Sequence, residues 1–90
     1  MTKQELVNRV AGGAQVSPEA TEMVINQTMT EIKKALFEGR NIYLRGFGTW
    51  LPKERKAKLA RNISRGTSVH VPAHRVPFFK PSKEFKDLLK

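Results

Sequence analysis

Cationic side chains dominate the segment between residues 53 and 65 of this 90-residue chain. Arginine and lysine form charge-assisted hydrogen bonds with phosphate oxygens, so a segment of this kind can bind a polyanion. One β-branched apolar side chain, Ile63, lies among these cations, and no nearby apolar sequence could form a core around it. The cations of the segment are Lys53, Arg55, Lys56, Lys58, Arg61 and Arg65.

The basic charge is confined to one part of the chain. Residues 1–39 hold four basic side chains and five glutamates, whereas residues 40–90 hold thirteen basic and three acidic side chains. The net charges of these parts are therefore −1 and +10. A surface that is merely solubilising would have both signs interspersed along the whole chain, so the asymmetry favours a polyanion-binding surface.

The carboxylates and histidines favour neither catalysis nor a metal site. Five of the eight carboxylates lie in the first 39 residues, and no pair of them suggests acid–base chemistry. His70 and His74 flank Pro72 in a strand-like pattern, which puts them about 13 Å apart at about 3.3 Å per residue. They cannot readily share an ion, and the chain has no cysteine. We expect no enzymatic activity, no metal, no cofactor and no small-molecule substrate.

A helical hairpin is predicted for the first 39 residues. Thr2 and Glu5 have the spacing of a capping box, and Gly12 and Gly13 are expected to end or loosen the first helix. Ser17 caps a second helix with a wide apolar face. The apolar positions of the two helices are Leu6, Val7, Val10, Ala11, Ala14, Met23, Val24, Ile25, Met29, Ile32, Leu36 and Phe37.

The hydrophobic period changes to two after Gly39, which ends the second helix. A hairpin with an apolar base and a cationic distal half follows, and then a short helix capped by Ser82. The predicted elements are a strand over 41–45, a tight turn over 46–48, a strand that starts at 49–51 and continues through 53–61, a turn around 62–66 and a strand over 68–71.

Strict alternation along residues 53–61 would sort the side chains of the hairpin onto two faces. Lys53, Arg55, Ala57, Leu59 and Arg61 would share one face, and Glu54, Lys56 and Lys58 the other.

The chain is long enough for one domain, but it buries too little apolar surface to be stable alone. It contains no cysteine that could crosslink it, so oligomerisation is the expected source of stability. No apolar run approaches membrane length, and Met1 leads directly into a helix without an apolar signal region. We expect a soluble, cytoplasmic protein that does not bind membranes.

Several motifs together resemble the HU/IHF family of bacterial histone-like, DNA-bending proteins, over essentially all 90 residues. They are Gly46-Phe47-Gly48, Arg61-Asn62, Val71-Pro72-Ala73, and Val76-Pro77-Phe78-Phe79-Lys80-Pro81 leading into Lys86-Asp87. The resemblance implies an α+β fold, an intertwined dimer with a helical base, a β saddle and two long arms that hold DNA in the minor groove.

The same resemblance implies one domain over residues 1–90. Residues 1–39 would form the helical dimerisation part, residues 40–80 the saddle with an arm at about 53–72, and residues 81–90 the C-terminal helix. Phe47, Trp50 and Phe79 would lie in the core of the dimer. We expect a homodimer, while pairing with a paralogous subunit stays open.

Two positions depart from the family. Most relatives have proline where this chain has Ile63, and glycine where it has Ala60. In the family the proline wedges between base pairs and kinks the duplex, so Ile63 becomes the expected wedge. The alternative is that Ile63 is only a loop residue, and isoleucine does not fix φ as proline does.

The DNA contacts expected from this resemblance lie on the arm and on the body. Phosphate contacts position a protein on DNA but read no sequence, and the minor groove offers a degenerate code. The expected contacts are Lys53, Arg55, Lys58, Arg61, Asn62, Ile63 and Arg65 on the arm, with Lys3, the Gly46 backbone, Arg75, Lys80, Lys83 and Lys86 on the body.

The predicted function is therefore to bend double-stranded DNA at the nucleoid with little sequence preference, and so to organise the chromosome. An IHF-like subunit that binds and bends defined sites is the alternative within the family. An RNA-binding module is disfavoured, because Tyr43 and Trp50 fall in the apolar base of the hairpin and leave no exposed aromatic platform. A membrane-surface protein would need a basic amphipathic helix, and the short C-terminal helix contains Glu84 and Asp87.

Overall fold

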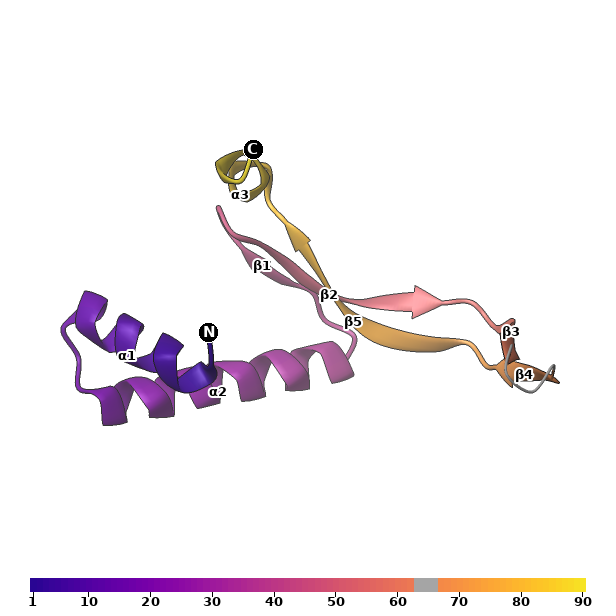
Figure 1. Ribbon diagram of the computed structural model, residues 1–90, viewed down its shortest axis with the longest axis horizontal. Helices are drawn as coiled ribbons and strands as arrows, with labels where there is room; N and C mark the ends of the chain where they lie inside the picture. Colours follow the sequence, from indigo (N-terminus) through magenta and orange to yellow (C-terminus); the bar gives the residue numbers. More distant parts are fainter. Residues whose placement is uncertain (63–66) are drawn as a thin grey trace. The chain divides into compact units, whose positions relative to one another are not determined.

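The computed structural model describes residues 1–62 and 67–90, which form two compact units, Met1–Lys34 and Ala35–Lys90. Within these described residues, three helices and five strands follow one another in the order α1, α2, β1, β2, β3, β4, β5 and α3 (Figure 1). The prediction of an α+β fold is confirmed. The helices are α1 (Lys3–Ala14), α2 (Pro18–Phe37) and α3 (Lys83–Leu88).

Side-chain oxygens cap the helices as the sequence predicts. The Thr2 Oγ1 accepts a hydrogen bond from the Glu5 amide over 3.2 Å, and the Ser17 Oγ accepts one from the Ala20 amide, also over 3.2 Å. Each cap satisfies an amide that has no partner within its own helix, which is why serine and threonine favour these positions.

The end of α1 differs from the prediction, because Gly12 and Gly13 lie inside the helix. The helix continues to Ala14, and Gln15 takes the left-handed conformation with φ 57° and ψ 47°. The amides of Gln15 and Val16 both donate to the Ala11 carbonyl, and Ala11 is only 4% exposed. These two hydrogen bonds to Ala11 stabilise the last turn of α1, and this offsets the low helix propensity of the two glycines.

The helical unit leaves much apolar surface uncovered. Val7, Ala11 and Thr21 are its buried residues. Leu6, Val10, Val16, Met23, Val24 and Met29 are exposed, and Met23 reaches 74%. Many large apolar side chains that stay in water on one unit are typical of an interaction surface.

Gly39 ends α2 as predicted, with a φ of +80° that glycine adopts without strain. The Arg40 amide donates to the Ala35 carbonyl and the Gly39 amide donates to the Leu36 carbonyl. These two bonds make a Schellman motif. The last turn of α2 belongs to the second unit.

A three-stranded antiparallel sheet carries the second unit, with the strand order β1-β2-β5. The turn from β1 to β2 is closed by the Phe47 amide, which donates to the Leu44 carbonyl over 2.9 Å, and Gly46 takes a φ of +81° inside it. Its strands are β1 (Ile42–Leu44), β2 (Gly48–Arg55) and β5 (His74–Pro81).

A separate two-stranded sheet, β3 (Lys58–Asn62) with β4 (Thr67–Val71), forms the distal part of the hairpin. The prediction of uninterrupted alternation along residues 53–61 is therefore wrong. Pairing stops after Arg55 opposite His74 and resumes at Lys58 opposite Val71. Pro72 lies in the gap and has no amide hydrogen to donate to the ladder.

Four aromatic rings pack over one end of the sheet. The Phe79 ring centroid lies 5.0 Å from that of Phe47 and 5.0 Å from that of Trp50, and Phe85 of α3 stacks 5.2 Å from Phe47. Phe47 is nevertheless 47% exposed. Phe47, Trp50 and Phe79, which were predicted to lie in the dimer core, thus form one cluster, and the Phe47 side chain remains partly exposed in the single chain.

The described residues include no helix that is long and apolar enough to cross a membrane.

Candidate nucleic-acid interface

The two faces of the sheet differ in chemistry, and the strand register shows how. Ile42, Trp50 and Phe79 form one cross-strand row, and the next row is Tyr43, Thr49 and Lys80. Successive residues of a strand point to opposite faces. The first row therefore lies on an aromatic face, and the second on a polar face.

A hollow of about 620 Å³ lies where the β1–β2 turn meets the start of α3. The Ser82 Oγ donates to the Gly46 carbonyl over 2.9 Å, and the Ser82 amide donates to the Phe47 carbonyl over 2.9 Å. These bonds bring the glycine turn against the end of β5. The lining residues are Tyr43, Leu44, Arg45, Gly46, Gly48, Thr49, Lys80, Pro81, Ser82, Lys83 and Lys86.

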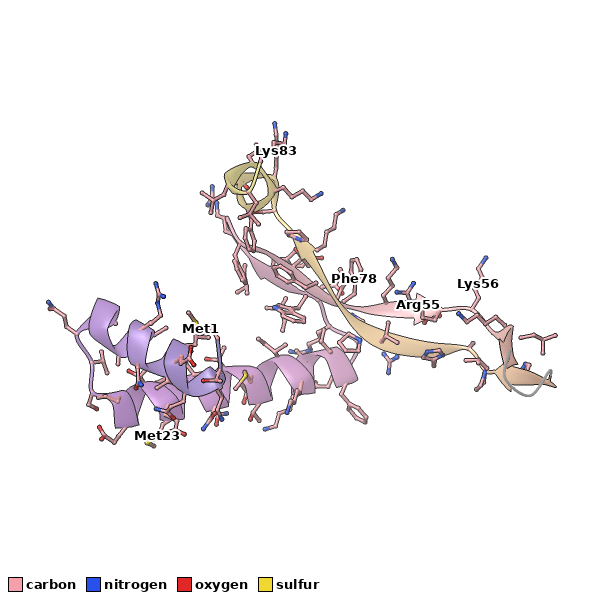
Figure 2. The ribbon with its side chains drawn as sticks, in the orientation of Figure 1. Met1, Met23, Arg55, Lys56, Phe78 and Lys83 are labelled. Carbon is pink, nitrogen blue, oxygen red and sulfur yellow. The ribbon has the colours of Figure 1, made fainter. Side chains whose placement is uncertain are left out.

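The predicted body residues Gly46, Lys80, Lys83 and Lys86 therefore share one hollow. Figure 2 labels Lys83 on α3, at one end of the second unit. Sequence reasoning missed Arg45, which lines the same hollow. Arg45 lies inside the turn that the hydrogen bond from the Phe47 amide to the Leu44 carbonyl closes, and its place directly before Gly46 in the sequence was a usable signal.

Tyr43 corrects one sequence-based interpretation. The sequence pattern puts it in the apolar base of the hairpin, but its side chain is 74% exposed and lies on the polar face. Its hydroxyl oxygen accepts a hydrogen bond from the Asn41 Nδ2 over 3.2 Å. Only Trp50 packs as expected, against Phe79. The polar face thus has an exposed aromatic ring among its cations.

Lys53 and Arg55 lie on the same face as Thr49 and Lys80, since alternate residues of β2 share a face. The Lys53 Nζ lies 4.3 Å from the centroid of the Phe78 ring, which is a cation–π contact. Figure 2 shows Phe78 and Arg55 in turn along β2 and β5, toward Lys56. The polar face therefore carries cations from the hollow to the interruption of the hairpin after Arg55.

A second hollow, of about 560 Å³, lies at that interruption. Lys56 and His74 were not among the predicted site residues, although they line it with Arg55 and Lys58. The His74 Nδ1 lies 2.9 Å from the Pro72 carbonyl oxygen, so in that pair the ring nitrogen donates. The remaining lining residues are Ala57, Val71 and Val76.

Some predicted residues lie elsewhere. The Lys3 Nζ donates to the Asn26 Oδ1 over 3.0 Å within the helical unit. Arg75 lies opposite Glu54, on the aromatic side of the sheet. Arg61 and Asn62 belong to β3 and pair with Ser68 and Thr67, while Ile63 and Arg65 lie outside the described residues.

The cations of the polar face have no acidic partner among residues 1–62 and 67–90. The ion pairs found there are Lys34 with Glu31, Arg40 with Glu38 and Lys90 with Asp87. Uncompensated like charges on one face repel one another, and phosphates of a bound polyanion would neutralise them. In the same part of the chain, no group of three histidine, cysteine or acidic residues could hold a metal ion.

Comparisons with known proteins identify a family and relatives for this chain. The family model of the bacterial DNA-binding proteins matches residues 1–90. The chain is 41% identical over 88 residues to integration host factor subunit beta of Methylococcus capsulatus, which covers 97% of this chain and 93% of the relative. It is 34% identical over 87 residues to DNA-binding protein HU-beta of Escherichia coli K12, with 97% of each chain covered.

Two solved structures have the same fold. HU in the Anabaena HU–DNA cocrystal structure superposes with a TM-score of 0.93 at 35% identity, covering 99% of this chain and 97% of that one. HU from Thermotoga maritima superposes with a TM-score of 0.71 at 26% identity and full coverage of both chains.

Proposed function

This chain belongs to the family of bacterial DNA-binding proteins that includes HU and integration host factor, and we propose that it binds double-stranded DNA as a dimer and bends it. The observation that supports this proposal best is the polar face of the second unit. There Lys80, Lys83 and Lys86 surround the Gly46 turn without acidic partners among the described residues.

The proposed phosphate contacts follow the polar face of the sheet outward along the hairpin. Lysine and arginine side chains would bind phosphate oxygens, and backbone amides near Gly46 could approach the duplex closely because glycine has no side chain. The residues proposed for these contacts are Arg45, Gly46, Lys53, Arg55, Lys56, Lys58, Arg61, Asn62, Arg65, Lys80, Lys83 and Lys86, with Ile63 as the wedge. Lys3, which lies in the helical unit and not on the sheet, is proposed as a further contact.

Low sequence specificity is the expected consequence. Phosphate contacts carry no sequence information, and the minor groove distinguishes little beyond A·T from G·C. An IHF-like subunit that recognises sites through their deformability is the second candidate, supported by the 41% identity to an integration host factor subunit. Selection of bound sequences from random duplexes separates the two, since only the second predicts an enriched motif.

We further propose that the protein acts at the nucleoid, where a DNA-bending protein meets its substrate. Bending without strong sequence preference would compact or organise the chromosome.

Dimerisation follows from the apolar side chains that one chain leaves in water, such as Met23 and Phe37. If folding requires two chains, the unfolding midpoint must rise with protein concentration. A tenfold increase is worth about 1.4 kcal/mol, which raises the midpoint by about 4 °C for a dimer of this size. Thermal scans at three concentrations, with a mass measurement in solution, test this. A constant midpoint together with a monomer mass would contradict the dimer.

Salt dependence tests the proposed phosphate binding. The logarithm of the affinity should fall linearly with the logarithm of the salt concentration, with a slope of about −0.9 per neutralised phosphate. Lys83→Ala or Arg55→Ala should each flatten the slope by about 0.9, because each variant leaves one phosphate without its cation, and sequence preference should not change. Lys34→Ala is the matched control, because Lys34 lies in the helical unit beside Glu31. A salt-insensitive complex would contradict the electrostatic argument.

A further inference from the structure

Arg75 stands apart from the other cations of the sheet. In β5, His74, Val76, Phe78 and Lys80 share the polar face, so Arg75 lies on the opposite face with Phe79. Its cross-strand partner Glu54 lies on that face too. The Arg75 side chain therefore lies on the aromatic face of the sheet, whereas the sheet residues proposed to contact DNA lie on the polar face.

The guanidinium group of Arg75 contacts the end of α2. Its Nη2 donates a hydrogen bond to the Phe37 carbonyl oxygen over 3.4 Å. A β-carbon built on Gly39 would lie 3.4 Å from the Nη1, so the group also covers the glycine that ends the helix. Arg75 thus lies at the end of α2, with one guanidinium nitrogen bonded to Phe37 and the other on the side of Gly39 where a β-carbon would be.

This helix end is a favourable place for a cation. The Schellman motif uses the carbonyls of Ala35 and Leu36, and the Phe37 carbonyl that follows them accepts from Arg75. The carbonyls at a helix C-terminus carry a partial negative charge, which a guanidinium group stabilises. The contact joins two segments that lie 38 residues apart in the chain.

We propose that Arg75 is a positioning residue that fixes the base of the arm (residues 53–72) to the end of α2. Arg75 lies next to His74, where pairing between β2 and β5 ends. A two-stranded ribbon is only marginally stable without further packing. A contact at Arg75, next to the last β2–β5 pair, would therefore fix the orientation of the base of the arm relative to the sheet. The effect of Arg75 on DNA bending rests on the proposed function, whereas its contact with the end of α2 does not.

Lysine and alanine variants distinguish this role from phosphate binding. Lysine keeps the positive charge and can still bind a phosphate, but it lacks the planar fork whose nitrogens reach the Phe37 carbonyl and the space beside Gly39 together. Arg75→Lys should therefore behave like Arg75→Ala if Arg75 is an anchor, and like wild type if it binds phosphate. Glu54→Gln controls for the cross-strand charge, and Lys83→Ala is the reference for removal of a phosphate-binding cation.

The first measurement is amide hydrogen exchange in the free protein, which requires no DNA. Removal of a charge-assisted hydrogen bond should make the Arg40 and Val76 amides exchange roughly 5-fold faster in both Arg75 variants than in wild type and in Glu54→Gln. Unchanged exchange in the Arg75 variants would overturn the anchor, even if the protein proved not to bend DNA.

The second measurement combines salt dependence with energy transfer between dyes at the two ends of a bound duplex. Both Arg75 variants should keep the wild-type salt slope but show less transfer at saturating protein, while Lys83→Ala should flatten the slope. A flattened slope in Arg75→Ala that Arg75→Lys restores would make Arg75 a phosphate contact and overturn the proposal. Wild-type transfer in both variants would also overturn it. If the wild type does not bend DNA, the proposed function fails and hydrogen exchange decides the anchor alone.

Discussion

Replacing Gly48 with alanine is expected to destabilise the protein by about 3 kcal/mol, near the upper end of what overpacking costs. A β-carbon at this position would lie 2.6 Å from the Lys80 carbonyl oxygen and 2.6 Å from the Phe79 Cζ. The oxygen belongs to the backbone of β5 and cannot move without disturbing the sheet. The Phe79 ring is held between Phe47 and Trp50. The dimer carries the substitution once in each chain, so it loses this free energy twice and its thermal midpoint should fall on the order of 10–20 °C.

Two other glycines provide controls of different sign. Gly12→Ala places its β-carbon in open space inside α1, where alanine is the better helix former, so stability should rise by about 0.5–1 kcal/mol. Gly46→Ala also meets no atom within 4 Å, but its φ of +81° costs an alanine about 1 kcal/mol. Equal midpoints for the Gly48→Ala and Gly46→Ala variants would show that the contact with Lys80 is not tight.

The helix starts could be predicted from single residues because capping is local. A hydroxyl three residues before an amide is enough to predict the bond, and Thr2, Ser17 and Ser82 all make it. The end of α1 could not be predicted this way. It lies at Gln15, whose left-handed conformation lets the amides of Gln15 and Val16 both donate to the Ala11 carbonyl, and the glycines at positions 12 and 13 do not indicate that position.

The sequence could predict that the candidate site is rich in lysine and arginine, but it could not predict how these residues are arranged. Arg75 and Lys80 are five positions apart, so a single strand must put them on opposite faces. That inference needs the bounds of β5, which Pro77 and Pro81 obscure because proline is unusual within strands. The prediction for Tyr43 is wrong because an aromatic residue in an apolar strand can face either side, and only the pairing with Thr49 and Lys80 assigns its face.

Truncation of Ile63 should reduce DNA bending more than any change to a single phosphate contact. If Ile63 is the wedge, it unstacks a base step at a cost of a few kcal/mol, which the extra surface wrapped by bent DNA offsets. Ile63→Ala removes the wedge but leaves the charged residues in place. Affinity for straight duplex should change little, while energy transfer between the duplex ends should fall.

Nicked and mismatched duplexes make the test quantitative. Unstacking is already partly complete in such DNA, so a protein with a wedge should prefer it to intact duplex. Removing the wedge removes the cost that the nick relieves, and the preference should fall about ten-fold. Ile63→Pro, the usual residue of the family, should keep both bending and preference. Ile63→Asp should abolish bending, because its carboxylate would lie against the bases and near the phosphates.

Leu59→Ala is the matched control for the wedge. Leu59 is another apolar side chain of the arm, four residues before Ile63, and it is 71% exposed. If general hydrophobicity of the arm caused bending, Leu59→Ala and Ile63→Ala would reduce energy transfer equally. A wedge acts at one position, because only a side chain at the point of insertion can replace the stacking that the base step gives up. The Leu59 variant should therefore bend DNA as wild type does. Equal bending by wild type, Ile63→Ala and Ile63→Asp would mean that Ile63 is a loop residue and that the bend comes from phosphate contacts alone.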